Sequence, residues 1–285
     1  MAKIIDGKLV SAKIKEEIKL EIDEMKKKGK QIPGLAVVIV GEDPASKVYV
    51  KNKKKDCEEV GIYSEEYALP ESTTEQELLE LVQKLNAKDN IHGILIQSPL
   101  PKHINESIII ENISPLKDVD AFHPENVGRI MIGNYSFMPC TPAGVMELLK
   151  YYNIDVIGKE CVVVGRSNIV GKPQAMMLLQ ANGTVTICHS KTVDLAKITK
   201  RADILVVAIR QRQFIKAGMV KEGAVVIDVG MNKKDDGKLC GDVDFYEVEK
   251  IASYITPVPG GVGPMTRTML LKNTLTAAKS RENNI

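Results

Sequence analysis

The chain has 285 residues, about twice the usual size of one domain, so two domains or one large α/β domain are expected. Hydrophobic residues make up 44% of the sequence and charged residues 27%, a globular balance that argues against disorder. The formal net charge is only +2 and tryptophan is absent, so the chain lacks the basic field and the rings of a nucleic-acid surface. No nucleic-acid partner is therefore predicted.

The cysteines and histidines show no metal-binding spacing. The five cysteines are scattered without a CxxC pair and the four histidines are isolated, which argues against a disulfide framework and against a metal site. The N-terminus lacks the long apolar core of a signal peptide, and no apolar run is long enough to span a membrane. We therefore expect a cytoplasmic protein with no metal ion and no membrane partner.

The first part of the chain alternates between helix and strand patterns. Apolar residues recur at helical spacing over residues 8–30, and residues 34–41 form the continuous apolar run of a buried parallel strand. The alternation continues with a helix over 44–60, a strand over 62–69, a helix over 73–86 and a strand over 93–97. This alternation predicts a parallel sheet covered by helices, and the irregular residues 102–124 are interpreted as the way out of a first domain.

A second alternating series begins at Thr141, which is predicted to cap a helix that has Pro142 in its first turn. Strands are expected over 160–164, 184–188, 204–208 and 224–229. Helices are expected over 172–181, 193–201 and 216–221, and residues 266–279 form a closing amphipathic helix. The second series therefore predicts a second α/β domain.

The turn after the strand at 160–164 has the form of a phosphate-binding turn. Gly165, Ser167 and Gly171 form an imperfect relative of the GxGxxG pattern, in which small residues let the backbone approach a phosphate at a helix N-terminus. The next strand ends without the acid that usually holds the ribose of NAD, whereas Arg166 and Ser190 suit a 2′-phosphate. NADP is favoured over NAD, with an ordinary strand-to-helix turn as the alternative.

One lysine of the helix over 44–60 stands out by its position. Lys53 falls on the same helical stripe as Tyr49, whereas the other lysines of the helix fall on the opposite, solvated face. A partly buried lysine has a lowered pKa and can act as an acid or a base near neutral pH. The alternative is that Lys53 extends from the edge of the stripe into water.

Three further features are candidates for a ligand site. Gln97 ends a buried strand, and the carboxyl ends of strands line the ligand crevice of an open α/β sheet. Asp120 lies in the irregular segment, where its place is open. The Gly/Pro-rich residues 257–266 form either a tight connection or a loop whose backbone can approach a flat ligand.

Seven segments in order resemble the bifunctional methylenetetrahydrofolate dehydrogenase/methenyltetrahydrofolate cyclohydrolase family, and the resemblance covers essentially the whole chain. They are PASKVYVKNK (44–53), GILIQSPLP (93–101), KDVD (117–120), PCTP (139–142), GRSNIVGKP (165–173), CHS (188–190) and PGGVGPMT (259–266). The resemblance implies two α/β domains around a cleft, the second a Rossmann-type parallel sheet, usually in a homodimer. It places a folate-binding catalytic domain at 1–120, joined by the C-terminal helix 266–285, and an NADP-binding domain at 121–265.

The resemblance also implies a reaction sequence in one-carbon metabolism that supplies purine biosynthesis. NADP oxidises 5,10-methylenetetrahydrofolate to the 5,10-methenyl cation, which is then hydrolysed to 10-formyltetrahydrofolate. By position, the implied catalytic residues are Lys53, Tyr49, Gln97 and Asp120. The implied substrate contacts are Ser46, Tyr49, Pro99, Asp120, Gly260, Gly261, Val262, Gly263 and Pro264. The implied cofactor contacts are Gly165, Arg166, Ser167, Ser190 and Met231.

The chain departs from the family pattern after Ala208, where a glycine and a proline are usual. Here Arg210 and Arg212 stand in their places, and Arg210 either strengthens phosphate binding or obstructs the nicotinamide. One alternative function is therefore a cyclohydrolase with weak or absent dehydrogenase activity. Others are an oxidoreductase of the shikimate or amino-acid type, which shares the two-domain plan, and a non-catalytic nucleotide-binding module.

Overall fold

The structure is a computed structural model that describes residues 1–282, apart from the side chains of residues 44–49 and 282. The chain divides into two compact units, named here after their sheets. The three-stranded unit comprises residues 13–140 and the C-terminal residues from Arg267 onward; the six-stranded unit comprises residues 1–12 and 141–266. The sequence predicts a domain boundary near residue 120, whereas the chain passes from the three-stranded unit to the six-stranded unit between Cys140 and Thr141.

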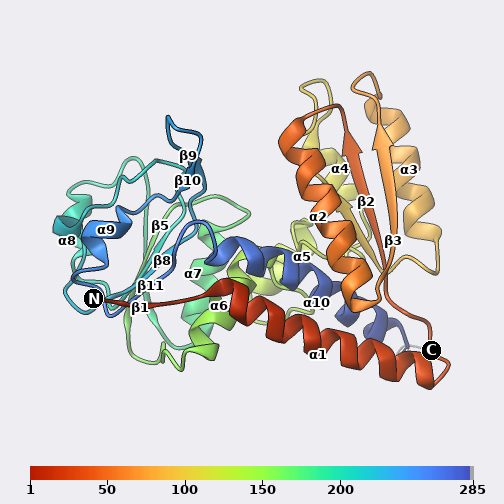
Figure 1. The fold of residues 1–285 in the computed structure, drawn as a ribbon. Helices are drawn as coiled ribbons and strands as arrows, with labels where there is room; N and C mark the ends of the chain where they lie inside the picture. Colours follow the sequence, from red (N-terminus) through yellow and green to blue (C-terminus); the bar gives the residue numbers. More distant parts are fainter. Residues whose placement is uncertain (283–285) are drawn as a thin grey trace. The chain divides into compact units, whose positions relative to one another are not determined.

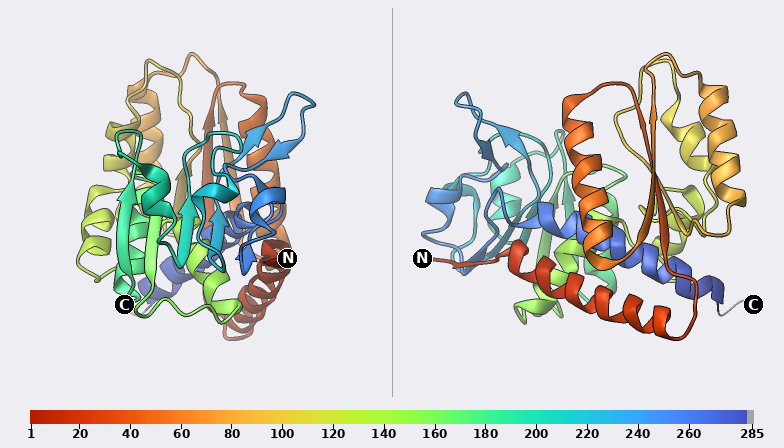
Figure 2. Two further views of the ribbon diagram at one scale, coloured as in Figure 1. Left: turned by 90° about the vertical axis from the view of Figure 1, so that its left-hand side faces the viewer. Right: turned by 45° about the vertical axis from the view of Figure 1, so that its right-hand side comes forward.

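The three-stranded unit is built on a parallel sheet of order β3-β2-β4. Its strands are β2 (Gly34–Val40), β3 (Tyr63–Leu69) and β4 (Gly93–Ile96). Its helices are most of α1 (Gly7–Lys27), α2 (Pro44–Val60), α3 (Glu75–Ala87), α4 (Glu106–Asn112), α5 (Pro124–Met131) and the later part of α10 (Val262–Glu282). Helix α2 lies on one face of the sheet, and α3 and α4 lie on the other (Figures 1 and 2).

The core of this unit follows from the alternation of side chains along β2. Ala36, Val38 and Val40 pack with buried side chains of α3 and α4 in one hydrophobic cluster. The intervening residues of β2 point to the opposite face, because successive side chains of a strand alternate. All seven residues of β2 are buried, which explains its continuous apolar sequence.

The predicted irregular segment contains more order than the sequence indicated. Helix α4 lies within it and is capped by Asn105, whose side chain accepts from the Ser107 N–H at 3.1 Å. Further on, Asp118 pairs with Ile94 in a parallel β-bridge, so this stretch runs beside β4 in the same direction. The register carries Asp120 to the carboxyl end of the sheet, level with the end of β4.

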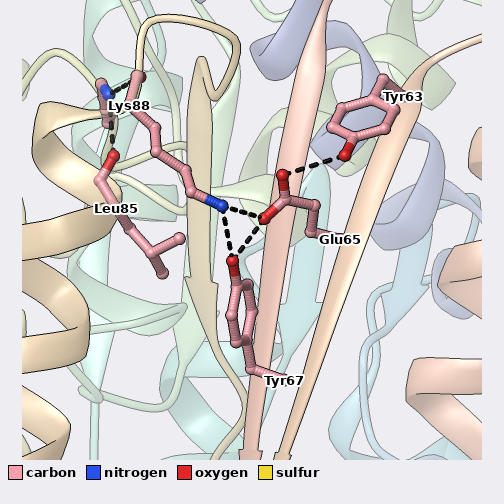
Figure 3. Close-up of polar contacts among 6 residues, drawn as sticks. Tyr63, Glu65, Tyr67, Leu85 and Lys88 are labelled. Carbon is pink, nitrogen blue, oxygen red and sulfur yellow. Dashed lines mark hydrogen bonds and ion pairs between the residues drawn. The ribbon is translucent and has the colours of Figure 1, made fainter.

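A polar cluster ties the edge strand β3 to the end of α3 (Figure 3). Glu65 accepts hydrogen bonds from Lys88 Nζ at 2.6 Å, from the Tyr63 hydroxyl at 2.9 Å and from the Tyr67 hydroxyl. Burial alone would raise the pKa of Glu65, but these three donors outweigh it and lower the pKa to about 2. Glu65 is therefore ionised at neutral pH.

The six-stranded unit contains a parallel sheet of order β1-β11-β8-β7-β5-β6 (Figure 2). The strands are β1 (Lys3–Ile4), β5 (Glu160–Val164), β6 (Thr184–Cys188), β7 (Ile204–Val207), β8 (Val225–Asp228) and β11 (Tyr254–Ile255). Strands β6 and β7 lie on opposite sides of β5, so the direction of winding reverses between β5 and β7. This reversal is the topological switch point of a Rossmann-type sheet, where ligands bind.

The remaining elements of this unit are short, apart from two helices. They are α6 (Cys140–Tyr151), α7 (Gly171–Gln180), α8 (Leu195–Thr199), the 3-10 helix η1 (Ala217–Met219), α9 (Phe245–Val248) and the antiparallel hairpin of β9 (Asn232–Lys233) and β10 (Leu239–Cys240). None of the helices among residues 1–282 combines the length and the apolar character needed to cross a membrane.

The predicted fold class is confirmed, since both units are α/β with parallel sheets and the second sheet is of Rossmann type. The structure differs from the sequence-based expectations in three details. Strand β1 pairs with β11, so the N-terminus belongs to the second sheet. Helix α6 begins at Cys140, so Thr141 lies inside its first turn and bonds Thr266 Oγ1 at 3.0 Å instead of capping. The helix expected over 216–221 is one 3-10 turn that contains Gly218, a poor helix former.

Candidate active site

The polar site of the three-stranded unit centres on Lys53 of α2. Lys53 is half-buried, and its Nζ donates a hydrogen bond to Gln97 Oε1 at 2.9 Å. Gln97 directly follows β4, and its Nε2 donates to the Ser98 carbonyl oxygen at 2.8 Å. Because the amide nitrogen is engaged by Ser98, the amide oxygen faces the lysine. The helix position and the strand end singled out in the sequence therefore meet in one hydrogen bond.

Four charged or ionisable groups surround Lys53 from different elements. Burial lowers the pKa of Lys53, and the Arg267 guanidinium on α10 lowers it further. Asp120, Cys140 and Cys57 act in the opposite direction. Burial is the largest of these effects, so the lysine holds its proton less firmly than an exposed lysine does.

Asp120 and Cys140 form the other side of this site. Asp120 lies with Ser98 and Phe122 in the lining of a small pocket at the carboxyl end of β4. Burial raises the pKa of the Cys140 thiol well above its ordinary value, and Asp120 raises it further. Asn273 of α10 donates to Cys140 Sγ at 3.7 Å. The thiol is therefore protonated and lacks the thiolate character of a nucleophile.

The sequence did not single out Cys140 or Arg267 as members of the site. Cys140 belongs to the PCTP segment, but only folding brings it beside Asp120. Arg267 comes from the last helix of the chain. No local pattern could have identified either residue, because both contacts join distant segments.

The glycine turn of the six-stranded unit lies at the switch point. Gly165 follows β5 with φ +134°, and a Cβ there would lie 2.4 Å from the Ala208 carbonyl oxygen at the end of β7. A Cβ on Gly171 would lie 2.2 Å from the Gly165 carbonyl oxygen. Both approaches require glycine. Ser167 Oγ accepts from the Val170 and Gly171 N–H groups, each at 3.2 Å, and so closes the turn at the start of α7.

The polar residues predicted to recognise a 2′-phosphate are open to solvent. Arg166 and Ser190 are both exposed, one after β5 and the other two residues after β6. The described strand end contains no acid between Cys188 and Thr192. Exposed cationic and hydroxyl groups beside a glycine turn fit a phosphorylated ribose.

The loop after β7 contains Arg210 and Arg212, which depart from the family pattern, and the carboxylate of Asp242 holds its backbone in place. Arg210 has a left-handed backbone with φ +54°, which costs an L-residue about 1 kcal/mol. Asp242 stabilises this conformation, since it accepts from the N–H groups of Ile209, Arg210 and Gln211 at 2.7, 3.0 and 2.8 Å. Arg212 is paired with Asp235 at 2.9 Å, whereas the side chain of Arg210 is exposed.

The Gly/Pro-rich segment is a tight connection over residues 257–261, and its residues from Val262 onward already form the first turn of α10. Gly260 has φ +112°, and the Gly261 N–H donates to the Pro257 carbonyl oxygen at 2.8 Å. Gly263 is exposed, and a Cβ there would lie 3.7 Å from Cε of Met231. Of the remaining predicted contacts here, Val262 is buried and Pro264 is half-buried. The segment therefore brings Met231 beside Gly263.

Two predicted site residues, Ser46 and Tyr49, have side chains that lie outside the described part of the structure. Pro99 is exposed and follows a cis peptide bond from Ser98. Among the residues that are described, no group of three His, Cys, Asp or Glu side chains is arranged to hold a metal ion.

A glycine turn at the switch point of a Rossmann-type sheet is typical of a nucleotide-binding unit, and the other unit holds a half-buried lysine that is bonded to a glutamine. Two family models match the chain and support this class of protein. Residues 5–120 match the catalytic domain of tetrahydrofolate dehydrogenase/cyclohydrolase, and residues 139–282 match its NAD(P)-binding domain. The chain belongs to the tetrahydrofolate dehydrogenase/cyclohydrolase family.

Individual relatives are similar over their whole length. The bifunctional protein FolD of Acetivibrio thermocellus is 62% identical over 278 residues, which cover 98% of this chain and 97% of the relative. The FolD structure from Campylobacter jejuni is 54% identical with a TM-score of 0.97, over 99% of this chain and 100% of that one. The Trypanosoma brucei enzyme, solved with NADP and an inhibitor, is 40% identical with a TM-score of 0.94, over 99% and 98% of the two chains.

These findings confirm the predicted family and the predicted pair of activities, methylenetetrahydrofolate dehydrogenase and methenyltetrahydrofolate cyclohydrolase. They also confirm a place in folate one-carbon metabolism and an NAD(P)-binding domain. The shikimate-type oxidoreductase and the non-catalytic module are thereby set aside.

Proposed function

We propose that Lys53 is the acid–base group of the hydrolytic step and that NADP is the hydride acceptor of the oxidative step. The observation that carries the proposal is the hydrogen bond from Lys53 Nζ to Gln97 Oε1 at 2.9 Å, made by a half-buried amine. The oxidation converts 5,10-methylenetetrahydrofolate to the methenyl cation. Water then opens the cation to 10-formyltetrahydrofolate with release of one proton.

The lowered pKa of Lys53 suits both proton transfers of this hydrolysis. The neutral amine accepts a proton from the water that attacks the methenyl carbon, and the resulting ammonium returns a proton to the ring nitrogen that leaves. A group serves in both directions when its pKa lies near the working pH. An exposed lysine with an ordinary pKa stays protonated at neutral pH and cannot accept the first proton.

Gln97 and Asp120 position the reacting groups in this proposal. Gln97 fixes the lysine through its amide oxygen, and Ser98 keeps that amide from rotating. The Asp120 carboxylate, at the pocket beside β4, accepts hydrogen bonds from the amino group of the pterin. We assign the other folate contacts by position to Ser46, Tyr49, Pro99 and residues 260–264, and the folate-binding catalytic role to the three-stranded unit.

The six-stranded unit has the features of an NADP site. Gly165 allows the diphosphate to approach the backbone, and Ser167 shapes the turn at the start of α7. Arg166 and Ser190 would recognise the 2′-phosphate, and Met231 is assigned by position as a further contact to the cofactor. When bound, NADP accepts a hydride from the methylene carbon. The NADP reported in the Trypanosoma brucei relative supports this choice of cofactor over NAD.

Lys53→Met separates the two reactions. Cyclohydrolase activity should fall about 10²–10⁴-fold, the usual contribution of an acid–base group, while hydride transfer to NADP continues. Both are measured on one preparation, the dehydrogenase by absorbance of the reduced cofactor and the cyclohydrolase by loss of the methenyl chromophore. Lys54→Met, at an exposed position of the same helix, is the matched control and should retain both activities. Equal cyclohydrolase rates in the two variants would reject the role of Lys53.

A second candidate is a cyclohydrolase with little dehydrogenase activity. The observation that favours it is the exposed Arg210 at the carboxyl end of β7, in a left-handed conformation that suits glycine. If Arg210 obstructs the nicotinamide, the double variant Arg210→Gly, Arg212→Pro should gain hydride transfer. Unchanged dehydrogenase activity in this variant would reject the second candidate.

We also propose that the protein is a cytoplasmic homodimer. The edge strand β3 supports dimerisation, because one side of it pairs with β2 and no described strand pairs with the other. Sedimentation equilibrium gives the mass in solution. A monomer at micromolar concentration would reject the dimer.

A further inference from the structure

A buried carboxylate links three helices next to the lysine of the three-stranded unit. Asp56 lies three residues after Lys53 on α2, and its side chain is only 6% exposed. Lys15 of α1 contacts its Oδ1 at 2.5 Å, and Arg267 Nη1 of α10 lies 3.3 Å from its Oδ2. Residues three apart on a helix face the same side, so the ion cluster borders the Lys53 site.

The two cations of this cluster are held in different ways. Lys15 has a second carboxylate partner in Glu59, at 2.8 Å. Arg267 forms an ion pair with Asp56, and Asp56 Oδ2 accepts no hydrogen bond from the described residues. The Arg267 contact is thus an ion pair without hydrogen-bond geometry, and the same guanidinium charge also acts on Lys53.

The ionisable groups that act on Lys53 come from four parts of the fold. Asp120 follows the stretch beside β4, Cys140 begins α6, Cys57 follows Asp56 on α2, and Arg267 lies on α10. Both thiols are buried, and burial raises the pKa of Cys57 to about 12, so they are protonated at neutral pH. The two remaining groups that act on Lys53 are the Asp120 carboxyl group, which raises the pKa of the amine, and the Arg267 guanidinium, which lowers it.

We propose that Arg267, anchored by Asp56, is a positioning residue for the hydrolytic reaction: its fixed positive charge disfavours a second positive charge on Lys53 and counters the attraction of Asp120. An arginine suits this role because it stays charged at every working pH, so the repulsion acts on the lysine proton alone. The inference rests on the proposed function of Lys53. It adds to that function the group that keeps the amine available as a base.

Arg267→Gln tests the proposal through the pH dependence of cyclohydrolase kcat/KM. Removal of the cation should move the acid limb of the profile by about half a pH unit toward higher pH, with the plateau at high pH unchanged. Arg267→Lys keeps the charge and should restore the wild-type limb. A residue that only stabilised the fold would lower the whole profile without moving the limb.

The matched control is Arg281→Gln, which removes another arginine of α10 from an aspartate, Asp89, at 3.1 Å. Its acid limb should coincide with that of the wild type. Thermal unfolding is followed for every variant, and Arg267→Met, which keeps the apolar stem, replaces Arg267→Gln if the latter does not unfold cooperatively.

An unmoved limb in the neutral Arg267 variant, or the same shift in Arg267→Lys, would overturn the proposal. Lys53→Met distinguishes this from failure of the function on which it rests. If that variant keeps full cyclohydrolase activity, the role of Lys53 fails. If it loses activity while Arg267→Gln leaves the limb in place, only the role of Arg267 fails.

Discussion

The candidate sites of the two units differ in what forms them: side chains form one and the backbone forms the other. In the three-stranded unit, the proposed site is made of side chains from separate segments, with Lys53 bonded to Gln97 and influenced by Asp120 and Arg267. In the six-stranded unit, the backbone forms the proposed site, because Gly165 and Gly171 allow approaches that any Cβ would block. A side-chain site is sensitive to charge and a backbone site is sensitive to shape. Substitutions in each unit should therefore affect one reaction more than the other.

The largest expected effect comes from Gly165→Ala. The new Cβ would lie 2.4 Å from the Ala208 carbonyl oxygen, so the ends of β5 and β7 must separate. Dehydrogenase kcat/KM should fall about 100-fold or more, equivalent to about 3 kcal/mol, while methenyl hydrolysis persists. Gly218→Ala is the control, because a Cβ there meets nothing within 4 Å. Loss of both reactions in parallel would show that the units do not separate the chemistry.

A smaller effect, in the other reaction, is expected from Gln97→Leu. The variant removes the oxygen that accepts from Lys53 Nζ, so the amine loses its fixed orientation. Cyclohydrolase activity should fall about 10- to 100-fold, while hydride transfer changes little. Gln97→Glu keeps an acceptor but adds a negative charge that favours the protonated lysine, so its acid limb should move toward higher pH. If Gln97→Leu lowers only the dehydrogenase, Gln97 does not serve the lysine.

Asp242→Asn tests the backbone site through the loop that carries Arg210. The carboxylate accepts from three successive N–H groups, and an asparagine turns an NH₂ group toward at least one of them. The free energy of unfolding should fall by about 2 kcal/mol and KM for NADP should rise several-fold. Urea unfolding and initial rates measure the two effects. The cyclohydrolase should stay near wild type, and a cyclohydrolase loss as large as the rise in KM would contradict the comparison.

The same contrast explains what the sequence could predict of the fold. The strands expected over 160–164 and 184–188 coincide with β5 and β6. Strand β5 is largely buried and apolar, whereas the edge strand β6 is rich in β-branched residues, which favour strands. Strands β1 and β11 were missed, since two residues have no periodicity and their pairing joins the two ends of the six-stranded unit. Local patterns therefore predicted the regular elements, and long-range pairing decided the sheet edge.

For the sites, residue type and position within an element were informative. Lys53 was predicted from its helical stripe and Gln97 from its strand end, and the structure brings them together. The Asp242 carboxylate and the Arg267 guanidinium were not predicted, because their partners, residues 209–211 and Asp56, are remote in sequence. The left-handed backbone of Arg210 had no sequence signal, since arginine is not a residue that favours it.

The smallest effect on catalysis is expected from Glu65→Gln. Glu65 is paired with Lys88 at the end of α3 (Figure 3), whereas Lys53 lies on α2, on the other face of the sheet (Figure 1). Both activities should stay within about twofold of wild type, as expected for an independent site. Stability should fall at neutral pH, because Glu65 is held ionised by Lys88 and two tyrosines. Its pKa in the folded protein is about 2, below the ordinary 4.5, so its contribution is complete above about pH 4.5 and is lost as the pH falls toward 2. The difference in urea midpoint between wild type and variant should shrink over that range, and a difference independent of pH would mean that the charge of Glu65 contributes nothing.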